Sequence, residues 1–139
     1  MSGSLEVLLP YTSYLAVLLR VWVGANLIIH GYPKLNSMEG TKKYAQTMGV
    51  PAFSAYLVTL IEFLGGIFLV IGLIVPVVGL LVATQFAAIT LSKKLKLKGA
   101  YISGQGPVKY EIDVLYLMLG VALVVLGAGP LSVDSLLGL

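Results

Sequence analysis

The sequence predicts an all-α fold, a four-transmembrane-helix antiparallel bundle. The chain has 139 residues, is 58% hydrophobic and 11% charged, and has a mean hydropathy of +0.99. A soluble domain of this length could not bury so much apolar surface, so lipid is the expected solvent. Apolar runs lie at about 11–31, 55–74, 76–92 and 111–127, near the length that crosses ~30 Å of hydrocarbon. We therefore expect residues 1–139 to form a single membrane domain.

The first apolar run, 11–31, carries unusual polar residues. Arg20 shares a helical stripe with Gly24 and Gly31, and small residues on such a stripe let a neighbouring helix approach closely. Asn26 and His30 lie on one flank of that stripe, four residues apart. A buried arginine is costly inside a membrane unless it is paired, so this run predicts a partner on another helix.

The second run, 55–74, supplies that partner. Glu62 lies among apolar residues, on one helical face with Thr59 and Gly66. The segment before it, 32–51, is predicted to be a loop, with a short helix at the membrane interface over about 39–48. The sequence thus predicts that Glu62 pairs with Arg20.

The remaining runs complete the predicted bundle. The turn at 72–76 implies an antiparallel hairpin of the second and third runs, and Gln85 is the strongly polar residue inside the third. The segment 93–110 is basic and rich in glycine. Glu111 and Asp113 open the fourth run, where they suit the positive end of a helix dipole.

The basic residues predict orientation. Eight of the nine lie in the two predicted loops: Lys34, Lys42, Lys43, Lys93, Lys94, Lys96, Lys98 and Lys109. The positive-inside rule places both loops in the cytoplasm and both termini outside the plasma membrane. The net charge of +3 therefore marks topology and predicts no nucleic-acid partner, although the lysines could also attract anions or an acidic protein.

Depths counted along the helices predict a polar pocket that opens toward the basic loops, with Arg20 and Glu62 at its floor. The catalytic candidates are Glu62, His30 and Arg20. The ligand-binding candidates are Arg20, Asn26, His30, Lys34, Glu62 and Gln85. We expect no metal site.

Each candidate also has a structural interpretation. Arg20 and Glu62 could be an ion pair that fixes helix register, and His30 could be an interfacial residue instead of a proton relay or ligand. Asn26 and Gln85 could hydrogen-bond between helices. Cysteine is absent, which excludes thiolate and iron–sulfur ligation, and one histidine argues against heme or copper ligation within this chain alone.

A series of short motifs runs along the chain: Arg20-x3-Gly24, His30-Gly31-x2-Lys34-Leu35, Gly49-x-Pro51, Glu62-x2-Gly65-Gly66, Gly72-Leu73 and Gly127-x-Gly129-x2-Ser132-x-Asp134. Their order resembles that of the DoxX-like family of small four-helix membrane proteins. The resemblance implies a compact four-helix bundle whose polar pocket is lined by Arg20, Glu62, His30 and Lys34. It also implies a link to membrane redox chemistry, because relatives include the membrane subunit of a thiosulfate:quinone oxidoreductase.

Two functions follow as hypotheses. The first is a subunit of a quinone-linked redox or respiratory complex, which would be a quinone-dependent oxidoreductase subunit if it is catalytic. A quinone is then the expected cofactor, because a pocket with Arg20, His30 and Glu62 would offer hydrogen bonds to its carbonyls and a path for protons. The sequence offers no metal, heme or flavin site, so electrons would come from a substrate or a partner subunit. The second is a non-catalytic accessory subunit of a larger membrane complex or a homo-oligomer. A small-solute carrier is a weaker third option, since four helices without a repeat leave little room for alternating access.

Overall fold

A computed structural model describes residues 6–102 and 104–139. In the described part, α-helices and one short 3₁₀ turn make up the named elements, so the all-α fold class is confirmed. The elements in chain order are η1 Leu9–Tyr11, α2 Thr12–Asn36, α3 Met38–Thr47, α4 Ser54–Ile71, α5 Val75–Leu95, α6 Glu111–Leu126 and α7 Val133–Leu137.

Among the described residues, three helical segments are long and apolar enough to cross a membrane: Leu9–Asn36, Ser54–Ile71 and Val75–Leu95. Helix α6 covers the fourth predicted run but has 16 residues, about 24 Å at the usual rise of ~1.5 Å per residue. The presence of four long helices matches the four apolar runs. That all four span the bilayer stays a prediction.

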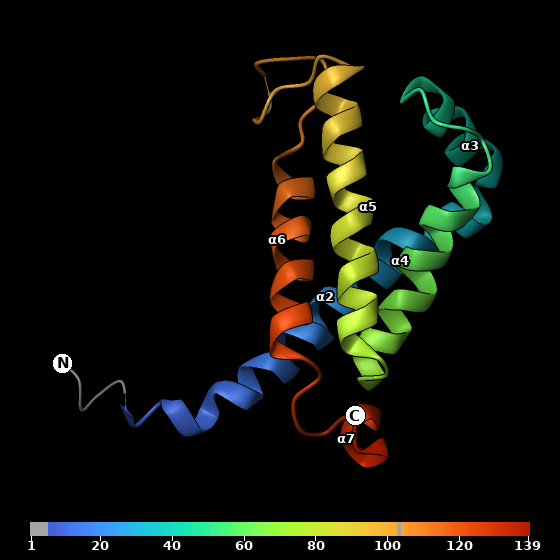
Figure 1. Ribbon diagram of the computed structural model, residues 1–139. Coiled ribbons are helices and arrows are strands. Elements are labelled where there is room, and N and C mark those ends of the chain that lie inside the picture. The colour runs from blue at the N-terminus through green and yellow to red at the C-terminus, as the bar shows by residue number, and fades with distance from the viewer. Residues whose placement is uncertain (1–5, 103) are drawn as a thin grey trace.

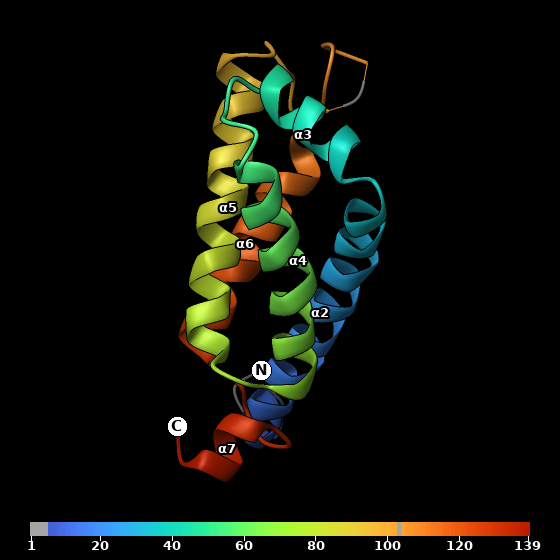
Figure 2. The ribbon, with the colours of Figure 1, turned by 90° about the vertical axis from the view of Figure 1, so that its right-hand side faces the viewer.

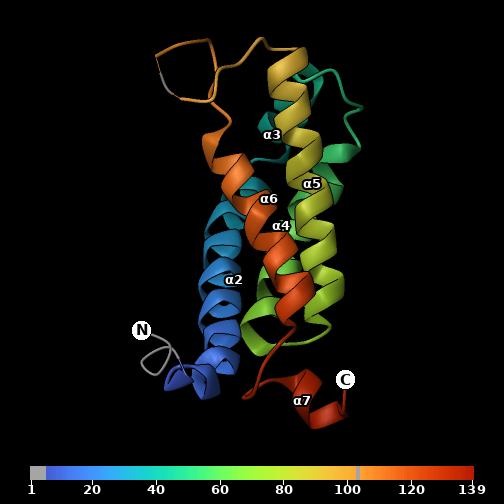
Figure 3. The same cartoon turned by 60° about the vertical axis from the view of Figure 1, so that its left-hand side comes forward.

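The long helices pack in two close pairs. Helix α4 runs along α2, and α6 runs along α5 (Figures 1, 2 and 3). Glycines set both contacts: a Cβ at Gly24 would lie 2.6 Å from the Gly66 carbonyl oxygen, and one at Gly120 would lie 2.8 Å from that of Gly79. Such close backbone approach is typical of membrane helix packing. The core between the pairs is apolar, with Leu27, Leu69, Val75, Val82 and Leu123 among its buried members.

The first helix is longer than predicted, because the apolar run ends at 31 but α2 continues to Asn36. Pro33 lies inside the helix and removes one backbone donor, yet its carbonyl still accepts from the Ser37 amide at 3.0 Å. The prediction of a loop from residue 32 was therefore wrong. Its consequence is that Lys34 lies on a helix, with a fixed direction.

Helix α3 confirms the short helix predicted near 39–48, and it lies across the same end of the molecule as the 96–110 loop (Figures 1 and 2). Helix α5 also exceeds its prediction by a turn. It includes Lys93 and Lys94, and positive charge in a last turn is favourable beside the helix dipole.

The opposite end of the molecule holds a polar cluster that we did not expect. After α6, the chain folds back under the α4–α5 turn and ends in α7 (Figure 1). The Asp134 carboxylate accepts from the Ile74 and Val75 amides at 2.6 and 3.0 Å, which caps α5. Its own amide donates to the Gly72 carbonyl at 2.9 Å. The tail is therefore an integral part of the packing.

Candidate functional site

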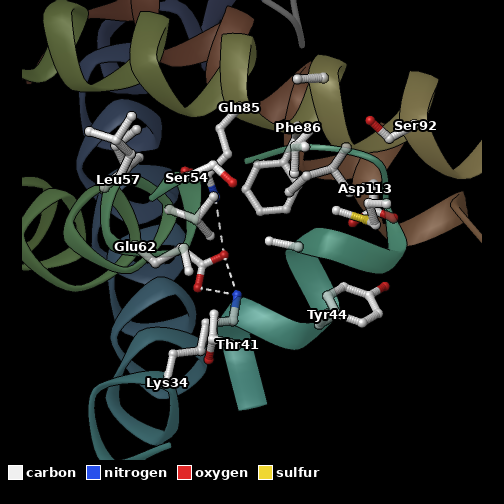
Figure 4. A pocket seen from close by; sticks show the side chains of 18 of the residues that line it. Lys34, Thr41, Tyr44, Ser54, Leu57, Glu62, Gln85, Phe86, Ser92 and Asp113 are labelled. Atoms are coloured by element: carbon white, nitrogen blue, oxygen red, sulfur yellow. Dashed lines mark hydrogen bonds and ion pairs between the residues drawn. The ribbon is translucent and has the colours of Figure 1, made fainter. Parts of the chain in front are cut away.

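Glu62 is the centre of the candidate site. Its side chain is buried, with 3% of its surface exposed. The Lys34 ammonium donates to both carboxylate oxygens, at 2.8 and 2.6 Å, and the Gln85 amide nitrogen donates to Oε1 at 3.1 Å. Figure 4 shows these two groups approaching Glu62 from different helices. Charge-assisted hydrogen bonds of this kind offset the cost of burying a carboxylate.

The partner of Glu62 is therefore Lys34, and the predicted pairing with Arg20 is wrong. The physical reason is side-chain direction, because Cα–Cβ bonds on a helix tilt toward its N-terminus. Lys34 lies near the C-terminal end of α2, next to α3, and its side chain points back along the helix toward Glu62. Helix α4 runs antiparallel to α2, so the Glu62 side chain points in the opposite direction, toward Lys34. Arg20 lies lower on α2 and points away from both.

Arg20 binds the opposite end of the bundle instead. It is 1% exposed, and its guanidinium donates to five carbonyl oxygens: those of Leu69 at 3.0 Å, Val70 at 2.6 Å, Ala128 at 2.8 Å, Leu131 at 2.6 Å and Pro130 at 3.5 Å. Two of these carbonyls belong to the last turn of α4, where carbonyl oxygens have no amide donor within the helix. Arg20 thus joins α2, α4 and the tail, and its five-donor fork is saturated.

A pocket of about 400 Å³ opens beside Glu62, between α3, α4, α5 and the upper ends of α2 and α6. Most of its wall is apolar. Phe86 and Tyr116 form an aromatic wall, stacked with ring centroids 4.8 Å apart and an interplanar angle of 18°. The pocket combines a flat aromatic surface with a few convergent polar groups, which is the usual composition of a small-molecule site.

Of Asn26 and His30, which both lie on α2, His30 lines the pocket and Asn26 does not. His30 lines the pocket from its exposed edge, where its ring packs edge-on against Tyr116 at 6.1 Å. Asn26 does not line it, and its amide nitrogen donates to the Trp22 carbonyl of its own helix at 2.9 Å. Asn26 belongs to a second, smaller groove of about 220 Å³ between α2 and α6. Ile112 and Tyr116 line both spaces.

Of the predicted ligand-binding residues, the pocket thus brings together His30, Lys34, Glu62 and Gln85, and it leaves out Arg20 and Asn26. Sequence reasoning missed a second ion pair on the pocket wall: Lys93 donates to Asp113 at 2.7 Å, with 16% and 12% of the two side chains exposed. The position of Asp113 in a first helical turn suggested a dipole cap, and no spacing in the sequence linked it to Lys93.

Gln85 leaves one polar atom unpaired. Its nitrogen binds Glu62, but its Oε1 is buried without a hydrogen-bond partner. Within residues 6–102 and 104–139, no cluster of three or more histidine, aspartate or glutamate side chains could hold a metal ion.

Comparison with known proteins identifies the family. Residues 15–94 match the model of the DoxX family. The chain belongs to the DoxX family. It is 34% identical over 118 residues to the Bacillus subtilis protein named "Putative oxidoreductase CatD", an alignment that covers 85% of this chain and 83% of that protein. It is 29% identical over 113 residues to the Escherichia coli "Inner membrane protein YqjF", covering 69% and 87%.

Membership confirms the resemblance deduced from the motifs and makes this chain a DoxX membrane protein. The matched region includes α3, α4 and most of α2 and α5, and hence Lys34, Glu62 and Gln85. No solved structure gives a significant match to this chain.

Proposed function

We propose that this DoxX protein binds a quinone headgroup in the pocket beside Glu62, as an integral membrane component of a quinone-linked redox or respiratory complex. The observation that carries the proposal is the Lys34–Glu62–Gln85 cluster at the wall of an apolar pocket with a stacked aromatic pair. A quinone ring is flat and apolar, and its two oxygens need polar partners. The name of the Bacillus relative supports a redox role.

The residues that line the pocket would have separate roles in binding a quinone and transferring protons. Phe86 and Tyr116 offer a stacking surface for the ring. Lys34 and Glu62 form an ion pair beside the pocket, and His30 lies at the edge of the pocket, where its imidazole would relay protons. A bound quinone would supply the capacity to take up two electrons and two protons. Electrons would come from a partner subunit or a small reductant.

The groove between α2 and α6 suits the apolar tail of such a ligand. Trp22, Leu115 and Leu119 line it, and it shares Tyr116 with the pocket. A lipid-soluble ligand could therefore keep its tail in the bilayer-facing groove while its ring occupies the pocket.

The proposal is tested by native mass spectrometry of protein purified gently from its own membrane. We expect a retained quinone in the unchanged protein and its loss in Ala88→Trp, which places a large ring at a pocket-lining position without changing charge. Leu80→Trp, at an exposed position on α5 outside the pocket, is the matched control and should keep the ligand. Absence of any quinone from the unchanged protein, with binding of added quinone also absent, would refute the proposal.

A second function, a non-catalytic accessory subunit, is favoured by one observation. Arg20, Glu62 and Asp134 all find partners within the chain, as charges with a purely structural role would. In that case the isolated protein should bind no quinone and should co-purify with larger subunits.

We further propose that all four long helices span the bilayer and that the α3 end faces the cytoplasm. Five exposed lysines gather at that end: Lys43, Lys94, Lys96, Lys98 and Lys109. Labelling of single cysteines placed at positions 43 and 136 with a membrane-impermeant reagent tests this orientation, because we expect only the second to react from outside the cell.

A further inference from the structure

The unpaired oxygen of Gln85 gives the pocket a specific hydrogen-bonding preference. Gln85 is 7% exposed, lines the pocket, and directs its amide nitrogen to Glu62 and its oxygen away from it (Figure 4). Buried polar atoms in native proteins are nearly always hydrogen-bonded, so each exception calls for an explanation. A ligand that donates a hydrogen bond to this oxygen would explain it.

The orientation of the Gln85 amide is fixed by its neighbour. If the amide were turned over, its oxygen would face the Glu62 carboxylate and two acceptors would repel each other. Lys34 donates to both carboxylate oxygens, at 2.8 and 2.6 Å, so both oxygens act as hydrogen-bond acceptors. The Lys34–Glu62 pair therefore sets which end of the amide is left for a ligand, and that end is an acceptor.

We infer that the pocket prefers the hydroquinone form of a quinone ligand over the oxidised form. This inference rests on the proposed function and adds a redox-state preference to it. A hydroquinone carries two hydroxyl donors, whereas an oxidised quinone offers only carbonyl acceptors, which would oppose the Gln85 oxygen. That oxygen has almost no exposed surface in the structure, so a hydroxyl would reach it only after a rotation of the Gln85 side chain toward the pocket.

The expected size of the preference follows from one hydrogen bond. A single net hydrogen bond changes an equilibrium constant by about five- to tenfold. Tighter binding of the reduced form raises the reduction potential of a bound two-electron couple, by about 30 mV for each tenfold difference in affinity. The bound quinone would thus be a better oxidant than the free quinone.

The test compares duroquinone and its hydroquinone, which have no tail, by anaerobic titration calorimetry of the protein in lipid nanodiscs. We expect the hydroquinone to bind about five- to tenfold more tightly, and Gln85→Met to remove most of that difference. Thr84→Val is the matched control. Thr84 also lines the pocket, but its hydroxyl is used on the Leu80 carbonyl at 2.9 Å, so the preference should remain.

The outcomes separate the two proposals. Equal affinity for the two forms in the unchanged protein would overturn the redox-state preference and leave the quinone site standing. Binding of neither form would overturn both. A preference that persists in folded Gln85→Met would overturn the assignment to the Gln85 oxygen. The comparison in the unchanged protein needs no variant, so the inference can be refuted even if Gln85→Met does not fold.

Discussion

Replacement of Lys34 by methionine should expose how strongly the bundle depends on the Lys34–Glu62 pair. Methionine keeps most of the length of the lysine stem but removes the charge. The Glu62 carboxylate, 3% exposed, would lose the donor that contacts both of its oxygens. Gln85 would remain as its only hydrogen-bond donor among those that the structure describes.

The size of the effect can be bounded. Breaking a fully buried ion pair by removing one partner costs about 3–5 kcal/mol, and a hydrogen bond to a charged group contributes about 1.5–3 kcal/mol. One third of the Lys34 side chain is exposed, so water screens part of the interaction. We therefore expect Lys34→Met to lower the free energy of unfolding by about 2–3 kcal/mol. Glu62→Gln in the same background should recover at least ~1 kcal/mol of that loss, since it removes the uncompensated charge.

The assay is a double-mutant cycle on reversible unfolding in mixed detergent micelles, followed by circular dichroism. Lys42→Met is the matched control, because Lys42 lies 3.3 Å from a Glu39 side chain that is 84% exposed, and such surface pairs contribute about 0–1 kcal/mol. The reasoning would be refuted if Lys34→Met were no more destabilising than Lys42→Met, or if the effects of Lys34→Met and Glu62→Gln simply added.

Three further predictions concern other parts of the fold. Arg20→Lys should destabilise the protein by more than about 2 kcal/mol, because three ammonium donors cannot replace a guanidinium group that reaches five carbonyls. Thermal unfolding in nanodiscs measures the loss of stability, and an unchanged unfolding midpoint would contradict the prediction. Gly24→Ala should lower the unfolding temperature, because the new Cβ would lie 2.6 Å from a backbone oxygen. Gly40→Ala is the control and should not lower it, because nothing lies within 4 Å of the new Cβ. Equal effects of the two substitutions would argue against close α2–α4 packing. Leu119→Trp should weaken the binding of a prenylated quinone but not of duroquinone, because Leu119 lines the α2–α6 groove and not the pocket. Calorimetry measures both affinities, and an equal loss of both would disprove the placement of the quinone tail in this groove.

The sequence located the central part of each of the four long helices, because a run such as 76–92 has few physical alternatives to a membrane helix. It did not locate the end of α2. It also predicted that the buried Glu62 must have a partner. It could not name that partner, because counting residues gives the depth of a Cα atom but not the direction of a long side chain. Arg20 and Lys34 lie on the same helix and both point toward its N-terminus, which brings Lys34 to Glu62 and takes Arg20 away.

The sequence predicts a loop at Lys34 because it follows Pro33, and a proline usually marks the end of a helix. The backbone shows that the helix continues past Pro33 to Asn36, with the Ser37 amide donating to the Pro33 carbonyl. The Lys93–Asp113 pair was missed for a related reason. Its members lie on either side of an irregular loop, and nothing local to the sequence fixes how that loop brings α5 and α6 together.

The attachment of the C-terminal tail has a consequence for biogenesis. Arg20 enters the membrane with the first helix, yet three of its five acceptor carbonyls belong to residues 128–131, which the ribosome makes after every long helix. Until those residues arrive, a buried guanidinium has only the end of α4 to bind, and the first turn of α5 lacks the Asp134 carboxylate. Completion of this end of the bundle is therefore coupled to synthesis of the tail, so a chain that stops at residue 126 should be recognised by the cell as unfinished and degraded.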